Sequence, residues 1–332
     1  MRTKRLLWVV AGAACFATVA VPVGSGSGSV EAAATGQIAI FYYPWYSTPR
    51  RDGGWAHWYV QHDGAPILST RYFPARGLYS SSNLKVVDAQ MREIRTAGVD
   101  TVVVSWWGFG SPEADRLPLV LDAAKRNGLD VAIHLEPYPG RTPASTALDI
   151  AQLAQSGITD FFVYDADSDP SAAWAEALSG LDGVRIFGQT TLVGRAKAAG
   201  FDGLYTYDVG TWNGSTFARI CTEAHAAGLL CAPSVGPGYD ARLATGDQLV
   251  RRRRGGTWYD RMWRAALRAR ADLVTITSYN EWQEGTQIEP ARAELGRPAY
   301  DGAWGREGAG AERAYLDATT RWTARARTGL PQ

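Results

Sequence analysis

Two carboxylates lie three residues apart in the segment from Thr277 to Gly285, which reads TSYNEWQEG. They are Glu281 and Glu284, and aromatic and amide side chains surround them. Cleavage of a glycosidic bond needs one acid to protonate the departing oxygen and a second carboxylate to assist at the anomeric carbon. The structural alternative is a surface helix start that carries two acids. The pair predicts a glycoside hydrolase site, with Glu281 and Glu284 as catalytic residues.

Short β-rich runs alternate with helical patterns along the chain, and the last run leads into this segment. The runs span 38–43, 101–106, 131–135, 161–164, 184–188, 203–207, 229–233 and 273–277, and the helical patterns span 86–96, 119–127, 147–155, 172–178, 192–199, 217–227, 259–271 and 311–324. This alternation predicts an α/β fold, a single (β/α)8 TIM barrel. A doubly wound open sheet is the alternative, but no Gly-rich phosphate loop follows the first run. The segment from Trp45 to Leu84 is then an extended loop after strand 1.

The ends of these runs should form the site, because TIM-barrel active sites lie at the carboxyl ends of the strands. Acids, aromatics and amides dominate those positions, and flat rings suit the C–H faces of sugars. The substrate-binding candidates are Tyr46, His57, Trp106, Trp107, Glu136, Tyr239 and Asn280. Glu136 either binds a sugar hydroxyl or orients Glu281, or it holds a loop through a backbone hydrogen bond. His57 either contacts substrate or packs as a structural histidine.

The sequence gives weaker indications of a metal site or an anion site than of a glycoside hydrolase site. His57 and His62 lack a recognised ligand spacing, so no metal and no cofactor are expected. The run from Arg251 to Arg254 predicts a solvated loop before a helix, with an anion site as the alternative. Cys221 and Cys231 either pair in a disulfide or remain buried free thiols. The formal net charge of +1 indicates neither a nucleic-acid partner nor a general affinity for anionic membranes.

The amino terminus resembles an export signal. A basic start and an apolar stretch precede the small residues Ala32–Ala34, which offer a cleavage site, so residues 1–34 are predicted to be a secretion signal. A membrane anchor is the weaker alternative, and Cys15 is a candidate lipidation site for a lipoprotein. Residues 35–332 would then form one catalytic domain of a secreted or cell-surface protein, with no membrane contact beyond export.

Several motifs together resemble glycoside hydrolase family 99, the endo-α-mannosidases, over nearly the whole chain after the signal. The long segment from Thr277 to Glu289 is the specific one. It is preceded in order by FYYPWY at 41–46, HW at 57–58, SWW at 105–107, HLEPY at 134–138 and GYD at 238–240. The resemblance implies a retaining enzyme that cleaves internal α-1,2-mannosidic bonds. Its substrate would be α-mannan or another mannose-rich glycan, including N-glycan-type oligosaccharides.

The resemblance also implies residue roles. Glu281 would deprotonate the sugar's 2-hydroxyl, which attacks the anomeric carbon to give a 1,2-anhydro sugar, and Glu284 would act as general acid and then general base. A direct glycosyl-enzyme is the alternative. Trp107 resembles a position used against the sugar one unit further from the cut, where Trp is similar to bacterial mannan-directed members. Gln283 departs from the pattern, since many relatives have His there, and this bears on fine substrate preference.

Two other functions are compatible with the same residues. One is a glycosidase of different linkage specificity on the same barrel. The other is a non-catalytic glycan-binding protein, which would retain the aromatic and acidic cleft without turnover.

Overall fold

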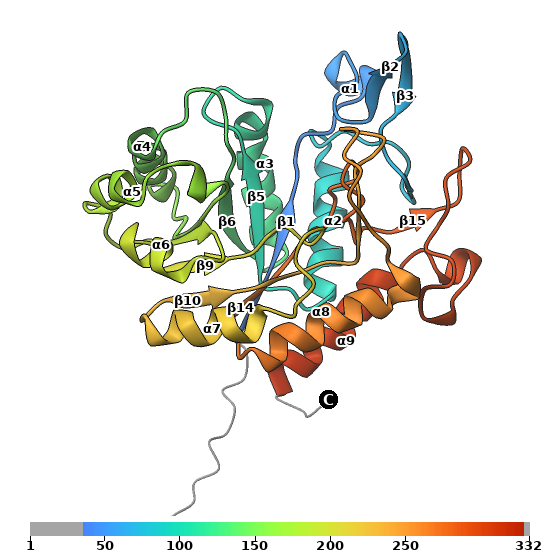
Figure 1. The fold of residues 1–332 in the computed structure, drawn as a ribbon. Helices are drawn as coiled ribbons and strands as arrows, with labels where there is room; N and C mark the ends of the chain where they lie inside the picture. Colours follow the sequence, from blue (N-terminus) through green and yellow to red (C-terminus); the bar gives the residue numbers. More distant parts are fainter. Residues whose placement is uncertain (1–35, 329–332) are drawn as a thin grey trace, which may run out of the picture. The chain divides into compact units, whose positions relative to one another are not determined.

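The computed structural model describes residues 36–328, and the strands of this part form a nearly closed parallel barrel with helices between them (Figure 1). The predicted secretion signal at 1–34, including Cys15, lies outside the described residues. None of the helices between 36 and 328 has both the length and the apolar character needed to cross a membrane.

The barrel strands bury both of their faces and run parallel to one another. They are β1 (Gln37–Tyr42), β5 (Thr101–Trp106), β6 (Asp130–Leu135), β7 (Asp160–Val163), β8 (Arg185–Gln189), β9 (Gly203–Tyr205), β10 (Leu230–Ala232), β11 (Ser234–Val235) and β14 (Leu273–Ile276). The order in the sheet is β10-β9-β8-β7-β6-β5-β1-β14-β11. The predicted TIM barrel is therefore confirmed. The run at 229–233 is interrupted at Pro233, which has no N–H to donate, so that β10 pairs with β9 and β11 with β14.

Helices follow the strands on the outside of the barrel. They are α2 (Leu84–Thr96), α3 (Pro112–Arg126), α4 (Pro143–Ala154), α5 (Ser171–Leu178), α6 (Val193–Ala198), α7 (Phe217–Ala226), α8 (Thr257–Arg268) and α9 (Ala314–Thr328). Helices α3 and α4 begin several residues before the predicted patterns. Ser111 and Thr142 cap them by accepting hydrogen bonds from backbone N–H groups of the first turn, and a proline follows each cap.

Two apolar layers hold the barrel together, and β1 contributes to both. Ile38 and Ile40 pack against the helices, in the larger cluster. Ala39 and Phe41 point into the barrel interior, where Phe41 contacts Phe162 with ring centroids 5.9 Å apart. This alternation continues to the carboxyl end of the strand, so that Tyr43 also belongs to the interior cluster.

The predicted extended loop after strand 1 carries small elements of its own. These are α1 (Pro49–Asp52), β2 (Tyr59–His62), β3 (Ala65–Leu68) and β4 (Phe73–Pro74). In Figure 1 the hairpin β2–β3 stands above the carboxyl end of β1. Strand β4 pairs with β15 (Ala291–Arg292), which joins this loop to the chain after β14.

A second two-stranded ribbon pairs β12 (Tyr239–Asp240) with β13 (Val250–Arg251). Short 3₁₀ turns lie at η1 (Ala166–Ser168), η2 (Arg254–Gly256), η3 (Ala303–Gly305) and η4 (Gly308–Gly310).

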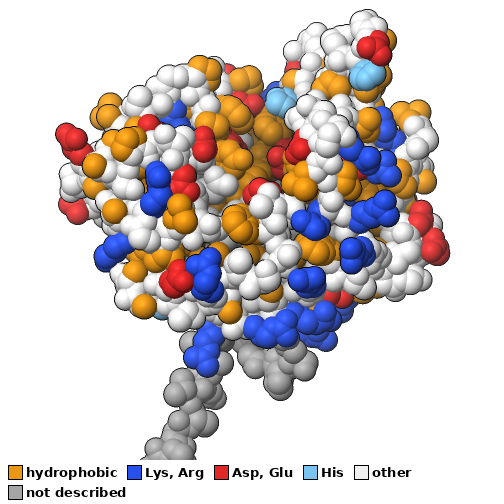
Figure 2. All heavy atoms as spheres, in the orientation of Figure 1, with side chains coloured by type: hydrophobic (Ala, Val, Ile, Leu, Met, Phe, Trp, Pro, Cys, Tyr) orange, Lys and Arg blue, Asp and Glu red, His pale blue; other side chains and the backbone are white. Residues whose placement is uncertain are grey.

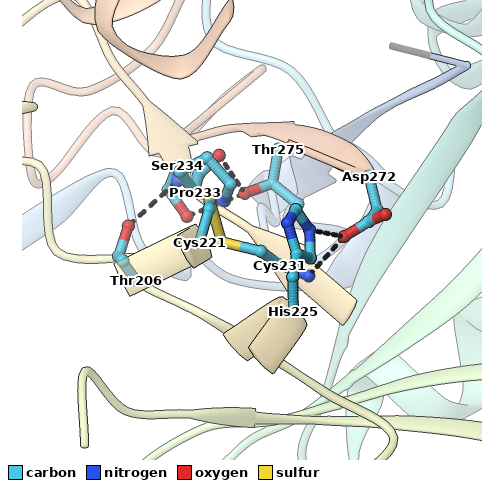
Figure 3. The surroundings of a disulfide bond; sticks show 8 residues. All are labelled: Thr206, Cys221, His225, Cys231, Pro233, Ser234, Asp272 and Thr275. Atoms are coloured by element: carbon cyan, nitrogen blue, oxygen red, sulfur yellow. Dashed lines mark hydrogen bonds and ion pairs between the residues drawn. A yellow bond between two sulfur atoms is a disulfide. The ribbon is translucent and has the colours of Figure 1, made fainter. Parts of the chain in front are cut away.

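The two cysteines left open by the sequence are joined in a disulfide between α7 and β10 (Figure 3). Nearby, Asp272 accepts hydrogen bonds of 2.8 Å from the backbone N–H of Cys231 and 2.8 Å from Nε2 of His225. Asp272 immediately precedes β14, so the disulfide lies at the amino ends of the strands, away from their carboxyl ends.

The prediction of a solvated loop at 251–254 is wrong for two of its four arginines. Arg251 donates hydrogen bonds to the carbonyl oxygen of Gly210, and its guanidinium lies over the ring of Trp258. Arg253 turns under the chain that follows β14 and donates to the carbonyl oxygens of Gly285 and Gln287. Because the backbone here is extended through β13, alternate side chains face inward, and the other two arginines are exposed.

Candidate active site

A hollow opens at the carboxyl ends of the barrel strands, and hydrophobic and acidic side chains line it (Figure 2). One cavity of about 220 Å³ in this region has Glu284 in its wall. The other lining residues are Tyr164, Tyr207, Asp208, Val209, Thr211, Tyr239, Asp247, Leu249 and Thr277. Apart from Tyr239 and Glu284, these were not named as site residues from the sequence.

Glu281 is buried and held by its own turn. Its backbone N–H donates to Oγ of Ser278 at 2.8 Å, and its Oε1 accepts from the backbone N–H groups of Gln283 at 3.0 Å and Glu284 at 3.2 Å. Its Oε2 is buried and has no hydrogen-bond partner among residues 36–328. Burial raises the pKa of Glu281 well above its usual range, and the charge of Glu284 adds to this effect. One carboxylate oxygen is therefore fixed by the turn, and the other is buried without a partner among the described residues.

Glu284 is half-buried, in the wall of the cavity. Burial raises its pKa from 4.5 to about 8, with further contributions from the charges of Asp208, Glu136 and Asp247. Its backbone carbonyl accepts a hydrogen bond of 2.8 Å from the N–H of Asp240. Gly285 follows at φ +66, and a Cβ there would lie 3.3 Å from backbone atoms of Asp240. The chain therefore needs glycine at this position to turn closely against β12.

Glu136 lies at the end of β6 in a chain of hydrogen bonds. Its Oε1 accepts from Oγ of Ser105 at 2.8 Å and is 2.8 Å from Nδ1 of His134. The indole N–H of Trp107 donates to the same Ser105 Oγ at 3.2 Å, and Nε2 of His134 is 2.9 Å from the hydroxyl of Tyr205. Neither a direct bond to Glu281 nor a loop held by the carboxylate through backbone bonds is found among the described residues. The network fixes Trp107 and Glu136 together at neighbouring strand ends.

The acids converge on two tyrosines inside the barrel mouth. The hydroxyls of Tyr43 and Tyr207 are hydrogen-bonded to each other. Burial raises the pKa of Tyr43 well above its usual range, and the charges of Glu136, Glu281 and Glu284 raise it further. The structure therefore brings the three predicted acids to one place.

Three predicted substrate contacts require correction. The side chains of Tyr46, Trp106 and Asn280 are fully buried, so they cannot touch a substrate in this arrangement. Trp106 packs edge-on against Phe109 and Tyr138. Periodicity alone placed these residues at strand ends, but it does not show which side of the backbone a side chain takes.

Tyr46 and Asn280 instead hold the segment that carries Glu281 and Glu284 against the end of β1. The side chain of Asn280 accepts from the N–H of Tyr43 at 2.8 Å and donates to its carbonyl at 3.0 Å. The hydroxyl of Tyr46 donates to the carbonyl of Asn280 at 2.9 Å and accepts from the N–H of Trp282 at 3.1 Å. We reassign both to positioning Glu281, which lies between Asn280 and Trp282.

His57 and Tyr239 are both half-buried at the rim. His57 stacks on Trp45 with ring centroids 4.3 Å apart, and its Nδ1 is 3.3 Å from Oε1 of Gln283. Burial lowers its pKa to about 4, so it is neutral at pH 7. Tyr239 donates to Asp247 at 2.8 Å. Within residues 36–328, no group of three or more His, Cys, Asp or Glu side chains could hold a metal ion.

Residues that the sequence reasoning missed fall into two kinds. Tyr164, Tyr207 and Asp208 stand at or just after strand ends, so the barrel rule pointed to their positions without assigning them. Asp247 comes from the loop between β12 and β13, and no pattern in the sequence places that loop at the cavity.

Comparison with known proteins agrees with this geometry. The model of Glycosyl hydrolase family 99 matches residues 34–328. A glycoprotein endo-alpha-1,2-mannosidase-like protein of Danio rerio is 33% identical over 314 residues, covering 76% of this chain and 71% of that protein. The glycoprotein endo-alpha-1,2-mannosidase of Xenopus laevis is 33% identical over 312 residues, covering 76% and 70%. The solved GH99 endo-alpha-mannosidase of Bacteroides thetaiotaomicron is 28% identical with a TM-score of 0.79, covering 89% of this chain and 99% of that one. This chain therefore belongs to glycosyl hydrolase family 99 and is a glycoside hydrolase.

Proposed function

We propose that this protein is a retaining endo-α-1,2-mannosidase that acts on mannan or N-glycan-type oligosaccharides. The observation that carries the proposal is the pair Glu281 and Glu284, in which one carboxylate is fixed by backbone N–H groups and the other faces a cavity with a raised pKa. The endo-α-1,2-mannosidase names of the relatives support the linkage.

Glu281 and Glu284 have different protonation states in this proposal. Burial raises the pKa of both carboxyls, and the charge of Glu284 raises the pKa of Glu281 further, so the pair retains a proton near neutral pH. Two backbone N–H groups stabilise the charged form of Glu281, whereas no described residue donates a hydrogen bond to the carboxylate of Glu284. We therefore assign the proton to Glu284 and the negative charge to Glu281 in the resting enzyme.

In the first step, the carboxylate of Glu281 removes the proton of the mannose 2-hydroxyl. The freed oxygen attacks the anomeric carbon from the face opposite the α leaving group, and the glycosidic C–O bond breaks as Glu284 donates its proton to the departing oxygen. The product on the enzyme is a 1,2-anhydro sugar. This route suits mannose, because its axial 2-hydroxyl lies opposite an α-linked leaving group.

In the second step, the carboxylate of Glu284 removes a proton from water, and the water oxygen attacks the anomeric carbon. The anhydro ring opens, and Glu281 returns its proton to the 2-oxygen. Each step inverts the anomeric carbon, so the released sugar retains the α configuration, and both acids end in their starting states.

The remaining site residues bind and orient the glycan in this proposal. Trp107, held through Ser105 beside Glu136, offers a ring face to the sugar one unit further from the cut. The carboxylate of Glu136 accepts a hydrogen bond from a sugar hydroxyl at Oε2, because Ser105 and His134 already contact its Oε1. Tyr239, in the cavity wall with Glu284, contacts the sugar on the leaving-group side.

The test is product analysis after incubation with linkage-defined α-mannooligosaccharides and α-mannan. Release of short oligosaccharides with a retained α-anomer, detected by NMR before mutarotation, is expected from the wild type. Glu281→Gln and Glu284→Gln should lower kcat by roughly 10²–10⁴-fold while the folded fraction by circular dichroism is unchanged. Cleavage of another linkage, or glycan binding without turnover, would refute the proposed specificity or catalysis respectively.

We also propose that residues 1–34 are a secretion signal and that the enzyme is secreted or exposed at the cell surface. The disulfide between Cys221 and Cys231 supports this, since such bonds persist in oxidising compartments. The mature protein from the culture medium should begin near residue 35 by amino-terminal sequencing. A lipid-modified protein beginning at Cys15 would contradict cleavage at that position.

A further inference from the structure

A second cavity beside the catalytic segment is lined mainly by arginines. Its volume is about 230 Å³, and its charged lining consists of Arg71, Arg242, Arg251, Arg252, Arg253 and Asp240. An adjoining cavity of about 430 Å³ shares three of these arginines and adds Arg254. Figure 2 shows Lys and Arg side chains gathered on the right of the hollow. The catalytic chemistry described above uses none of them.

The positive charge of this arginine cavity is only partly neutralised by the chain around it. Asp240 is its acidic lining residue, and it pairs with Arg242 at 2.7 Å and with Arg71 at 3.5 Å. No carboxylate among residues 36–328 lies within ion-pair distance of Arg251, Arg252 or Arg253. An excess of positive charge in a concave site focuses the field and attracts anions.

Two of the arginines are rigidly held by neutral groups. Arg251 donates to the carbonyl oxygen of Gly210 at 3.1 and 2.8 Å, and its guanidinium lies 4.8 Å from the centre of the Trp258 ring. Arg253 packs against the rings of Tyr72, Tyr300 and Tyr315.

The guanidinium of Arg253 donates to the carbonyl oxygens of Gly285 at 2.9 Å and Gln287 at 2.6 Å from one nitrogen. Its other terminal nitrogen, Nη1, is buried and has no hydrogen-bond partner in the described part of the chain. Carbonyls and rings leave the positive charge of both arginines intact. Their fixed positions also reduce the entropy that ligand binding would cost.

The arginine cavity adjoins the catalytic one. Tyr239 lines both cavities. Gly285 lines the arginine cavity, and its neighbour Glu284 lines the catalytic cavity. A glycan chain that passes Tyr239 can therefore place a substituent against the arginines while another of its sugars lies at Glu284.

We propose that the arginine cavity binds a phosphate ester carried by the glycan, so that phosphorylated mannose-rich glycans are preferred over neutral ones. The planar guanidinium group matches the geometry of phosphate and can donate hydrogen bonds to two of its oxygens at once. Neutral sugar hydroxyls carry no negative charge, so they bind a guanidinium more weakly. This inference rests on the proposed function for the identity of the glycan. It adds the substituent that the glycan carries.

The test compares two mannans that differ only in phosphate. The Glu284→Gln protein, which should bind without cleaving, is run by affinity electrophoresis through phosphate-bearing α-mannan and through the same mannan after enzymatic removal of its phosphate. Retention should be on the order of tenfold stronger with phosphate present, as charge-assisted hydrogen bonds of this kind provide. The preference should shrink as ionic strength rises.

Matched arginine variants locate the effect. Arg252→Ala in the same background should remove most of the preference, whereas Arg219→Ala, an equal charge change on α7, should leave the preference in place. Equal retention by the two mannans, or equal loss in both arginine variants, would overturn the inference. Competition by inorganic phosphate without any preference between the mannans would also overturn it and would identify free phosphate as the ligand.

The proposed function and this inference can fail separately. If wild-type protein cleaves neither mannan, the proposed function is wrong. The ratio of retention on the two gels still shows whether the arginine cavity binds phosphate.

Discussion

The backbone N–H of Glu284 donates a hydrogen bond of 3.2 Å to Oε1 of Glu281. The turn that carries one of the two proposed catalytic acids therefore orients the other. A second donor, the N–H of Gln283, binds the same oxygen. The other oxygen of Glu281 is thereby left for the substrate, in the direction set by the turn.

Activity should fall at alkaline pH with the ionisation of Glu284. Its pKa of about 8 keeps the acid protonated at neutral pH, and loss of that proton removes the general acid. We expect kcat/KM on an oligosaccharide to decrease above about pH 8. A substrate with an activated aryl leaving group needs less protonation, so its kcat/KM should decrease less in the same pH range. An equal alkaline decrease for both substrates would contradict the assignment.

The thermal stability of the protein should also depend on pH through the ionisation of Glu284. The folded pKa of Glu284 is raised, so its stabilising contribution is complete below pH 4.5 and is lost as pH rises through about 8. Thermal denaturation should therefore show Glu284→Gln gaining Tm relative to the wild type between pH 5 and pH 9. Glu307→Gln, at an exposed glutamate outside the cavity, is the matched control. A constant difference across this pH range would show that Glu284 does not titrate as described.

Removing one hydroxyl should weaken the support of the catalytic turn. Tyr46→Phe removes the hydroxyl that bonds both the buried carbonyl of Asn280 and the N–H of Trp282, which then keep only their 3.0 Å bond to each other. We expect the free energy of unfolding to fall by about 1–3 kcal/mol, measured in urea, with a lower kcat because Glu281 lies between these two residues. Tyr59→Phe, on β2 at a half-buried tyrosine, is the comparison. A stable variant with full activity would remove Tyr46 from the positioning role.

The disulfide should matter for stability and not for chemistry. Replacing both Cys221 and Cys231 by serine opens a link with a sequence separation of 10 residues. The free energy of unfolding should decrease by roughly 2–4 kcal/mol, while kcat at 25 °C stays near the wild-type value because the bond lies at the amino ends of the strands. Reductant should destabilise the wild type and leave the double variant unchanged. An equal response of the two proteins to reductant would mean that the thiols are not bonded.

Much of the fold could be read from the sequence because its signals are local. Short apolar runs and helical periodicity are set by neighbouring residues, and the run predicted at 101–106 has the observed bounds of strand β5. The starts of α3 and α4 were missed because Ser-Pro and Thr-Pro caps lie outside the periodic pattern.

The site was predictable to the extent that position along a strand decides it. Glu281 and Glu284 lie in the segment after β14, and Glu136 follows β6, so the barrel rule alone brings them to one end of the barrel.

Only the tertiary structure decided which side chains face the cavity. Tyr46, Trp106 and Asn280 turn inward to packing and backbone partners, while Asp247 reaches the cavity from a loop with no strand signal. Arg253 is drawn beneath the catalytic segment by carbonyls more than thirty residues away in the chain. These outcomes depend on register and on contacts between distant segments, and no local pattern encodes them. The sequence by itself determined the barrel and its acids, and the packing of distant segments determined what surrounds them.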